Sequence, residues 1–305
     1  MNHNNNFEKL IKAYPMLDYF TDRPFGIENE FYNIDYVTTP IDEGIIRPYC
    51  FGMDATQRKI IEDSSGKHGI LLGTDRDSWH LETDTSVRGN RHTRSGAELV
   101  SPILRGIEGL RSAYNAFQFL KDIGAKVDST CGFHVHQGVD KDVYKNQQIK
   151  ELFSIISPIE NYFYLKIPGD RKNNNTCKPM QINIEKFLEG MDSHCDTSDR
   201  RIKRLWYSDE NEFREKVSER YDRTRYHGLN LHSFWCKSTI EFRYHSAILD
   251  NIDEAMQWII FTQFLVNLSE NLPEIPEIKR IKEPNKWVEM IYKIYYDFGA
   301  MDKIV

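Results

Sequence analysis

Cysteines and long apolar runs are scarce in this chain, and their scarcity excludes two classes of protein. The 305 residues include five cysteines, an odd number, and contain no Cys-x-x-Cys pair. We therefore expect neither a disulfide framework nor a thiolate zinc site. The strongest apolar run, residues 256–266, contains two glutamines and is shorter than the roughly 20 residues of a membrane-spanning helix. It predicts a buried helix.

Positive charge is not in surplus either. The 40 Lys and Arg residues stand against 46 Asp and Glu residues, which gives a formal net charge of -6. This charge offers nucleic acids and acidic membranes no general electrostatic attraction. The first residues lack the basic start and the apolar stretch of a secretory signal. We expect a cytoplasmic protein that binds neither nucleic acid nor a membrane, and the sequence leaves its oligomeric state open.

The two common phosphate-binding loops are also missing. The chain contains no Gly-x-x-x-x-Gly-Lys-Ser/Thr loop and no Gly-x-Gly-x-x-Gly motif before a helix. Neither a P-loop nor a dinucleotide-binding fold is therefore indicated. A nucleotide would have to be held by metal ions on a sheet.

Three segments place ligand-type side chains two residues apart between apolar ones. They carry Glu28 and Glu30 in residues 26–31, His134 and His136 in residues 131–138, and Glu241, Arg243 and His245 in residues 239–245. Alternate side chains of a β-strand point to one face, so each set is predicted to share a face. A polar face is ordinary in a half-buried strand, but clustered His and Glu are typical of metal or catalytic sites. The sequence predicts one shared polar site.

The remaining pattern predicts an α+β fold. We expect strands at residues 79–84 and 97–100, helices at residues 7–17, 110–123, 149–156, 252–268 and 286–298, turns and small strands at residues 33–75, and regular alternation at residues 229–234. Gly124 is placed to end the second of these helices. Strands with helices over only one sheet face imply a layered architecture whose polar strand faces line a cleft.

A polar segment, residues 169–225, interrupts these elements. It is heavily charged and has few apolar runs, so it is predicted to be an insertion, either a helical lid or a solvated excursion. With 40% hydrophobic residues, the chain can bury one large core or two smaller ones.

The residue types of the predicted site favour a hard cation. Carboxylates with imidazole and no thiolate suit Mg²⁺ or Mn²⁺, and clustered carboxylates repel one another unless a cation neutralises them. Arg243 adds a positively charged fork that suits phosphate. Metal, carboxylates and arginine together indicate phosphoryl transfer from a nucleotide.

Six motifs, taken in order, resemble one enzyme family. They are Gly26-Ile-Glu-Asn-Glu-Phe31, Asp84-Thr-Ser86, Gly96-Ala-Glu-Leu-Val-Ser-Pro102, Cys131-Gly-Phe-His-Val-His136, Arg225-Tyr-His-Gly-Leu-Asn230 and Thr239-Ile-Glu-Phe-Arg243. The set resembles the amidoligases, relatives of glutamine synthetase and glutamate-cysteine ligase, over residues 24–270. The resemblance implies a single catalytic domain, residues 1–305, with a glutamine synthetase-like fold: an antiparallel sheet curved into a funnel and backed by helices.

The resemblance also implies an activity and assigns roles to individual residues. The activity is the ATP-dependent joining of a carboxylate to an amine, on an amino acid, a peptide or a protein, through an acyl phosphate. The metal-binding positions correspond to Glu28, Glu30, Glu98, His134 and Glu241. Nucleotide or substrate contacts correspond to His136, Arg225, Asn230 and Arg243, of which Arg243 also stabilises the transferred phosphoryl group. Asp84 is the candidate base for the amine. The implied cofactors are ATP and Mg²⁺, with Mn²⁺ as a substitute.

Other interpretations stay open at this stage. His134, His136 and Glu241 could hold iron in a cupin-like oxygenase, or the fold could be a binding module without catalysis. The two histidines could be hydrogen-bonded core residues, and Arg243 could simply pair with a glutamate. The arginine-rich segment 88–94 is more typical of a solvated turn. His232 and His245, which share faces with the proposed ligands, are expected to support the site or to lie at the surface.

Overall fold

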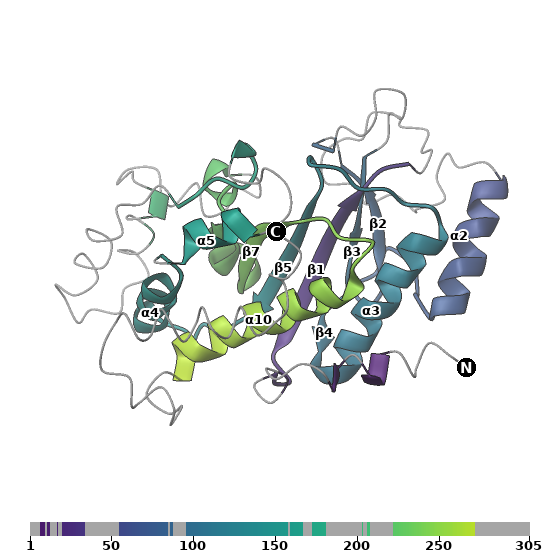
Figure 1. The fold of residues 1–305 in the computed structure, drawn as a ribbon. Helices are drawn as coiled ribbons and strands as arrows, with labels where there is room; N and C mark the ends of the chain where they lie inside the picture. The colour runs from purple at the N-terminus through teal and green to yellow at the C-terminus, as the bar shows by residue number, and fades with distance from the viewer. Residues whose placement is uncertain are drawn as a thin grey trace. The chain divides into compact units, whose positions relative to one another are not determined.

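A computed structural model describes a large part of the chain (Figure 1). The described residues are 7–9, 11–12, 17, 20–33, 55–84, 86–87, 96–157, 159–166, 173–180, 203, 206–207 and 222–271. The predictions for residues 88–94 and 286–298, and for most of residues 169–225, lie outside them.

Strands and helices alternate irregularly along the described chain. The strands are β1 Pro24–Phe31, β2 His80–Thr83, β3 Ala97–Val100, β4 Leu104–Arg105, β5 Gly132–Gly138, β6 Leu229–Asn230 and β7 Thr239–Ser246. The helices are α2 Ala55–His68, α3 Gly106–Asp122, α4 Asn146–Ile156, α5 Glu160–Lys166, α9 His232–Lys237 and α10 Ile252–Asn271, with the 3-10 helix η3 Arg223–Arg225. This mixture confirms the predicted α+β class.

The strands form one open sheet. Their order is β2-β3-β1-β5-β7-β6, and β4 pairs with β1 off this path. Strand β1 is antiparallel to β3 and β4, β2 is antiparallel to β3, and β6 is antiparallel to β7. The three segments predicted to carry the site are therefore strands β1, β5 and β7, which follow one another in the sheet.

Contacts divide the chain into two compact units. Unit 1 comprises Met1–Ala13, Pro24–Val135 and His245–Trp258, and unit 2 comprises Tyr14–Arg23, His136–Tyr244 and Ile259–Val305. Strands β5 and β7 and helix α10 each contribute residues to both units. The single catalytic domain at residues 1–305 stays a prediction.

In unit 1, helix α3 packs its apolar face onto the sheet. Leu110, Tyr114 and Phe117 are buried, as their three- and four-residue spacing predicts. The Phe117 ring meets Phe133 of β5 edge to face, with 5.4 Å between the ring centroids. Gly124 follows the end of the helix with a φ of 78°, a left-handed conformation that glycine adopts without strain.

In unit 2, residues of α10 hold strand β5. The side-chain amide of Gln137 donates to the carbonyl oxygen of Ile259 at 3.2 Å and to Oγ1 of Thr262 at 3.0 Å. Phe163 of α5 packs edge to face on Phe261, with 6.1 Å between centroids. The predicted buried helix at residues 256–266 is therefore confirmed. Within the described part of the chain, no helix combines the length and apolarity that crossing a membrane requires.

Helix α2 lies where the sequence predicts turns and small strands, so that prediction is wrong for residues 55–68. The run Ser64-Ser65-Gly66 resembles a turn, and few apolar residues mark a helix face. Packing against α3 stabilises the helix instead (Figure 1). Ile61 and His68 are buried, and Nε2 of His68 lies 2.8 Å from Oδ2 of Asp122. Tertiary contacts here override weak local propensity.

Helix α9 replaces the second half of the alternating segment at residues 229–234. Only Leu229–Asn230 are strand, and His232–Lys237 are helical. Oδ1 of Asn230 accepts a hydrogen bond from the backbone N–H of His232 at 2.9 Å. A side chain that bonds the backbone two residues ahead starts a turn and does not extend a strand.

Candidate functional site

Three glutamates of unit 1 lie in one row across three neighbouring strands. The antiparallel register places Glu98 of β3 opposite Glu30 of β1 and opposite Glu82 of β2. Directly opposite residues have Cβ atoms about 4.5–5.5 Å apart on the same face. The row brings together two predicted site residues, Glu30 and Glu98, and one that was not predicted, Glu82. Glu28, two residues before Glu30, shares their face.

Crowding and burial disfavour the charged form of Glu98. Desolvation raises the pKa of Glu98 well above its ordinary value, and the negative charges of Glu28, Asp84, Glu30 and Glu82 raise it further. Both effects act against an ionised carboxylate. A cation among these residues would oppose both, so the cluster has the chemistry of a cation site.

The imidazole of His134 lies between two of the predicted carboxylates. Its Nδ1 is 3.3 Å from Oε2 of Glu28, and its Nε2 is 3.5 Å from Oε1 of Glu30. The other oxygen of Glu30 accepts a hydrogen bond from the backbone N–H of Gly132 at 2.6 Å. His134 is 2% exposed and Glu30 is 4% exposed. Strands β1 and β5 thus bring their predicted ligands together in unit 1.

Asp84 follows strand β2 and is half-buried. Its Oδ1 accepts a hydrogen bond from the backbone N–H of Ser86 at 2.6 Å, and its own N–H donates to the carbonyl oxygen of Gly96 at 2.9 Å. A Cβ at Gly96 would lie 2.3 Å from the Asp84 carbonyl oxygen. Glycine therefore lets the two segments approach, and this approach holds the Asp84 segment against the start of β3.

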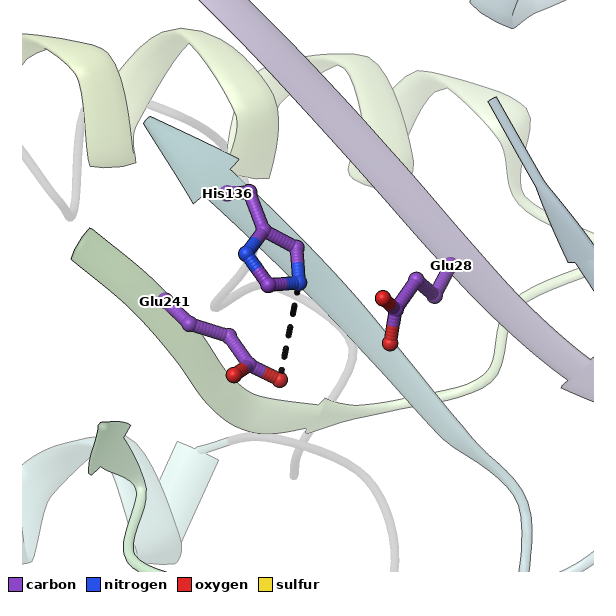
Figure 2. Close-up of side chains that lie close together, drawn as sticks. All are labelled: Glu28, His136 and Glu241. Carbon is purple, nitrogen blue, oxygen red and sulfur yellow. Dashed lines mark ion pairs between the residues drawn. The ribbon is translucent and has the colours of Figure 1, made fainter. Parts of the chain in front are cut away.

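Unit 2 gathers a second cluster around Glu241. Its Oε1 accepts a hydrogen bond from Nη1 of Arg243 at 2.6 Å, and its Oε2 accepts one from Nδ2 of Asn230 at 2.5 Å. Nε2 of His136 lies 3.7 Å from Oε1; the dashed line in Figure 2 marks this ion pair, and the figure also draws Glu28 of unit 1. All four residues of the cluster are buried. Arg243 compensates the charge of Glu241.

Neighbouring oxygen atoms fix the orientation of His136 and Arg243. Nδ1 of His136 lies 3.0 Å from Oγ1 of Thr239. Nε of Arg243 donates to the carbonyl oxygen of Thr176 at 3.1 Å, and the backbone N–H of Arg243 donates to the carbonyl oxygen of Gly228 at 2.7 Å. The guanidinium group is therefore held at two of its nitrogens before any ligand arrives.

A family comparison shows what kind of protein carries these two clusters. The family model described as "Putative amidoligase enzyme" matches residues 21–266. The chain belongs to this amidoligase family. The match spans both clusters and confirms the family that the six motifs resemble. A search among curated proteins finds no match.

One histidine of this amidoligase, His245, is placed differently from expectation. His245 was expected to share a face with Glu241 and Arg243, but its ring packs against Phe133 and Trp258, with centroids 6.3 Å and 5.3 Å away. Phe133 belongs to the apolar face of β5, so the shared-face prediction is wrong for His245. The reason is packing: α10 offers the ring an aromatic contact and a carboxylate, Glu254, whose Oε1 lies 3.3 Å from Nε2. His232 is buried, which excludes the surface position, one of the two alternatives expected for it.

Arg225 is the predicted nucleotide contact with the most open surroundings. It ends η3, is half-buried, and carries its guanidinium 5.6 Å from the ring centroid of Tyr226. Its role in binding stays a prediction.

Two residues close to Glu98, Glu82 and His80, were not predicted from the sequence. Nδ1 of His80 lies 3.3 Å from Oε1 of Glu82. The sequence pattern could have identified them, because both residues alternate with the buried Trp79 and Leu81 in a strand that was predicted. The pairing of Glu82 with Glu98 could not be predicted, because strand register is a tertiary property.

Proposed function

We propose that this amidoligase is an ATP-dependent carbon–nitrogen ligase. It would activate the carboxylate of an amino acid, peptide or protein as an acyl phosphate and join it to an amine, in a glutamine synthetase-like catalytic fold. Family membership supports ligation, and the mostly antiparallel sheet is compatible with that fold. The observation that carries the proposal is the convergence of Glu28, Glu30 and His134, with Glu98 in register beside Glu30.

The donor chemistry of these residues fits Mg²⁺, or Mn²⁺ in its place. Hard divalent cations take carboxylate oxygens, and the raised pKa of Glu98 reports repulsion and burial that a cation would relieve. The ligands that we propose are Glu28, Glu30, Glu98, His134 and Glu241. When bound, the cation would screen the charge of the ATP phosphates.

Strand β5 links the two clusters along the chain. His134 and His136 are two residues apart in it, which corresponds to a rise of about 7 Å on the same strand face. We propose that both clusters serve one reaction. We assign the ATP contacts to His136, Asn230, Arg225 and Arg243.

Arg243 is the residue that we assign to the transferred phosphoryl group. Its planar fork suits phosphate oxygens, and Glu241 and Thr176 hold it in place. In the first step, the substrate carboxylate attacks the γ-phosphorus of ATP, and ADP leaves. The positive charge of Arg243 offsets the repulsion between the two anions. The product is an acyl phosphate.

In the second step, the amine attacks the acyl carbon and phosphate leaves. The amine nitrogen must lose a proton, and a carboxylate within reach serves as the general base. Asp84 is our candidate because it is half-buried and its charge acts on Glu98, which places it beside the glutamate row.

An assay for ADP release tests the proposal. The purified protein is incubated with Mg²⁺, ATP and a panel of amino acids and peptides, and ADP is expected only when an acceptable carboxylate is present. Oxygen consumption without ATP would instead favour an iron oxygenase built on His134, His136 and Glu241. Binding of ATP with no turnover on any panel member would favour a non-catalytic module.

A further inference from the structure

We propose that Glu82, oriented by His80, is a further carboxylate of the cation site and lies at the β2 end of the glutamate row. The inference rests on the proposed function, because it takes a divalent cation to bind among Glu28, Glu30 and Glu98. It adds two residues that neither the six motifs nor the family match assigns.

Sheet register aligns Glu82 with the proposed ligands. Glu82 pairs with Glu98, and Glu98 pairs with Glu30, so the three side chains leave one sheet face side by side. Opposite Cβ atoms about 4.5–5.5 Å apart let neighbouring carboxylates share one cation, or bridge two cations about 3.5–4 Å apart. Glu98 is the middle member of the row, and Glu82 can therefore act on whatever cation Glu98 binds.

His80 is held beside Glu82 by the chain that precedes β2. Its Nε2 lies 2.7 Å from the main-chain carbonyl oxygen of Asp75. A carbonyl oxygen only accepts, so Nε2 carries the proton. The other ring nitrogen, Nδ1, lies 3.3 Å from Oε1 of Glu82. His80 therefore holds the Glu82 carboxylate in place from one side.

The same arrangement is typical of carboxylates at metal sites. Such a carboxylate is itself held by a hydrogen-bonding neighbour, which fixes its orientation toward the metal. The turn that holds His80 is itself fixed: Oδ1 of Asp75 accepts hydrogen bonds from Oγ of Ser78 at 2.9 Å and from the backbone N–H of Asp77 at 3.0 Å. The ring of His80 is thus oriented before a cation binds.

Partial exposure of the pair suits a hydrated cation. The side chains of His80 and Glu82 are 16% and 24% exposed. Magnesium gives up its water ligands reluctantly and usually keeps several, so a position that water reaches is compatible with it.

Titration of metal-free protein with Mn²⁺, followed by the EPR signal of the unbound ion, tests the inference. Glu82→Gln is expected to weaken Mn²⁺ affinity about tenfold, and His80→Ala by a similar factor, as substitutions of supporting residues at metal sites do. The matched control is Glu62→Gln, which removes one negative charge from an exposed position of α2 and should leave the affinity unchanged. The urea midpoint of each metal-free variant shows whether the fold is retained.

The results separate this inference from the proposed function. If Glu98→Gln weakens Mn²⁺ binding and Glu82→Gln does not, the role of Glu82 is wrong and the cation site stands. If neither substitution changes Mn²⁺ binding, the cation site of the proposed function fails as well. A loss in Glu82→Gln without a loss in His80→Ala overturns the orienting role of His80.

Discussion

At the residue scale, the two clusters balance their carboxylates differently. Glu241 receives hydrogen bonds from Arg243 and Asn230, so its charge is compensated within unit 2. Glu98 instead shares its surroundings with other carboxylates that raise its pKa. Removing the carboxylate should therefore destabilise the protein at Glu241 and relieve repulsion at Glu98.

Glu241→Ala is expected to destabilise the protein by about 3–5 kcal/mol, because it leaves the buried guanidinium of Arg243 without this counter-charge. The free energy of unfolding in urea at neutral pH measures the effect. Glu241→Gln keeps an oxygen that can accept from Arg243, so its loss should be smaller, while both variants lose ATP turnover. An alanine variant as stable as the wild type would show that Glu241 does not compensate Arg243.

The raised pKa of Glu98 predicts how stability depends on pH without metal. The pKa of a glutamate in the unfolded chain is about 4.3, whereas the folded Glu98 holds its proton to higher pH. Above the unfolded pKa, the unfolded chain binds fewer protons than the folded protein, so stability falls as pH rises through the folded pKa of Glu98. Stability is highest, for this group, below the unfolded pKa.

Urea unfolding in EDTA across this pH range checks the effect. Glu98→Gln should lose stability less steeply than the wild type as pH rises, and excess Mg²⁺ should reduce the slope of the wild type. Identical slopes for the two proteins in EDTA would contradict the raised pKa.

At the element scale, strands and helices with strong local periodicity could be predicted, and those that depend on tertiary contacts could not. Alternation identified β1, β5 and β7, and the spacing of apolar residues identified α3. Helix α2 carries little periodicity and depends on its contact with α3, and α9 depends on the turn formed by Asn230. The register that adds Glu82 to the site is likewise invisible along the chain.

The contact between α2 and α3 is expected to contribute measurably to stability. His68 is buried and Asp122 is about one-third exposed, with 2.8 Å between Nε2 and Oδ2. Hydrogen bonds to charged groups contribute about 1.5–3 kcal/mol, and the exposure of Asp122 reduces this to about 1 kcal/mol. A double-mutant cycle with His68→Ala and Asp122→Ala should give a coupling energy of this size.

The matched control is the Lys59–Asp63 pair on the same helix. Its nitrogen and oxygen atoms are 2.8 Å apart, but both side chains are largely exposed, at 73% and 65%. Such exposed i,i+4 pairs contribute little to stability. A coupling in the His68–Asp122 cycle no larger than in this control would mean that the helix contact rests on apolar packing alone.

At the scale of the whole molecule, the order of the motifs was more informative than any single motif. Each motif is short, but five of the six contain residues of strands in one sheet and the other directly follows β2. A family match over residues 21–266 confirms what they resemble. Within unit 1 the predicted ligands Glu28, Glu30 and His134 converge. Within unit 2, the side chains of Asn230 and Arg243 both donate hydrogen bonds to Glu241.

The most direct measurement of the central claim is the fate of a carboxylate oxygen. The amidoligase is incubated with Mg²⁺, ATP, an amine and a panel of amino acids and peptides whose carboxylates carry ¹⁸O, and the released phosphate is analysed by mass spectrometry. Attack of the carboxylate on the γ-phosphorus followed by amide formation transfers one carboxylate oxygen to phosphate, so phosphate with a single ¹⁸O is the predicted product. Phosphate released without ¹⁸O, or no phosphate with any substrate of the panel, would contradict the account.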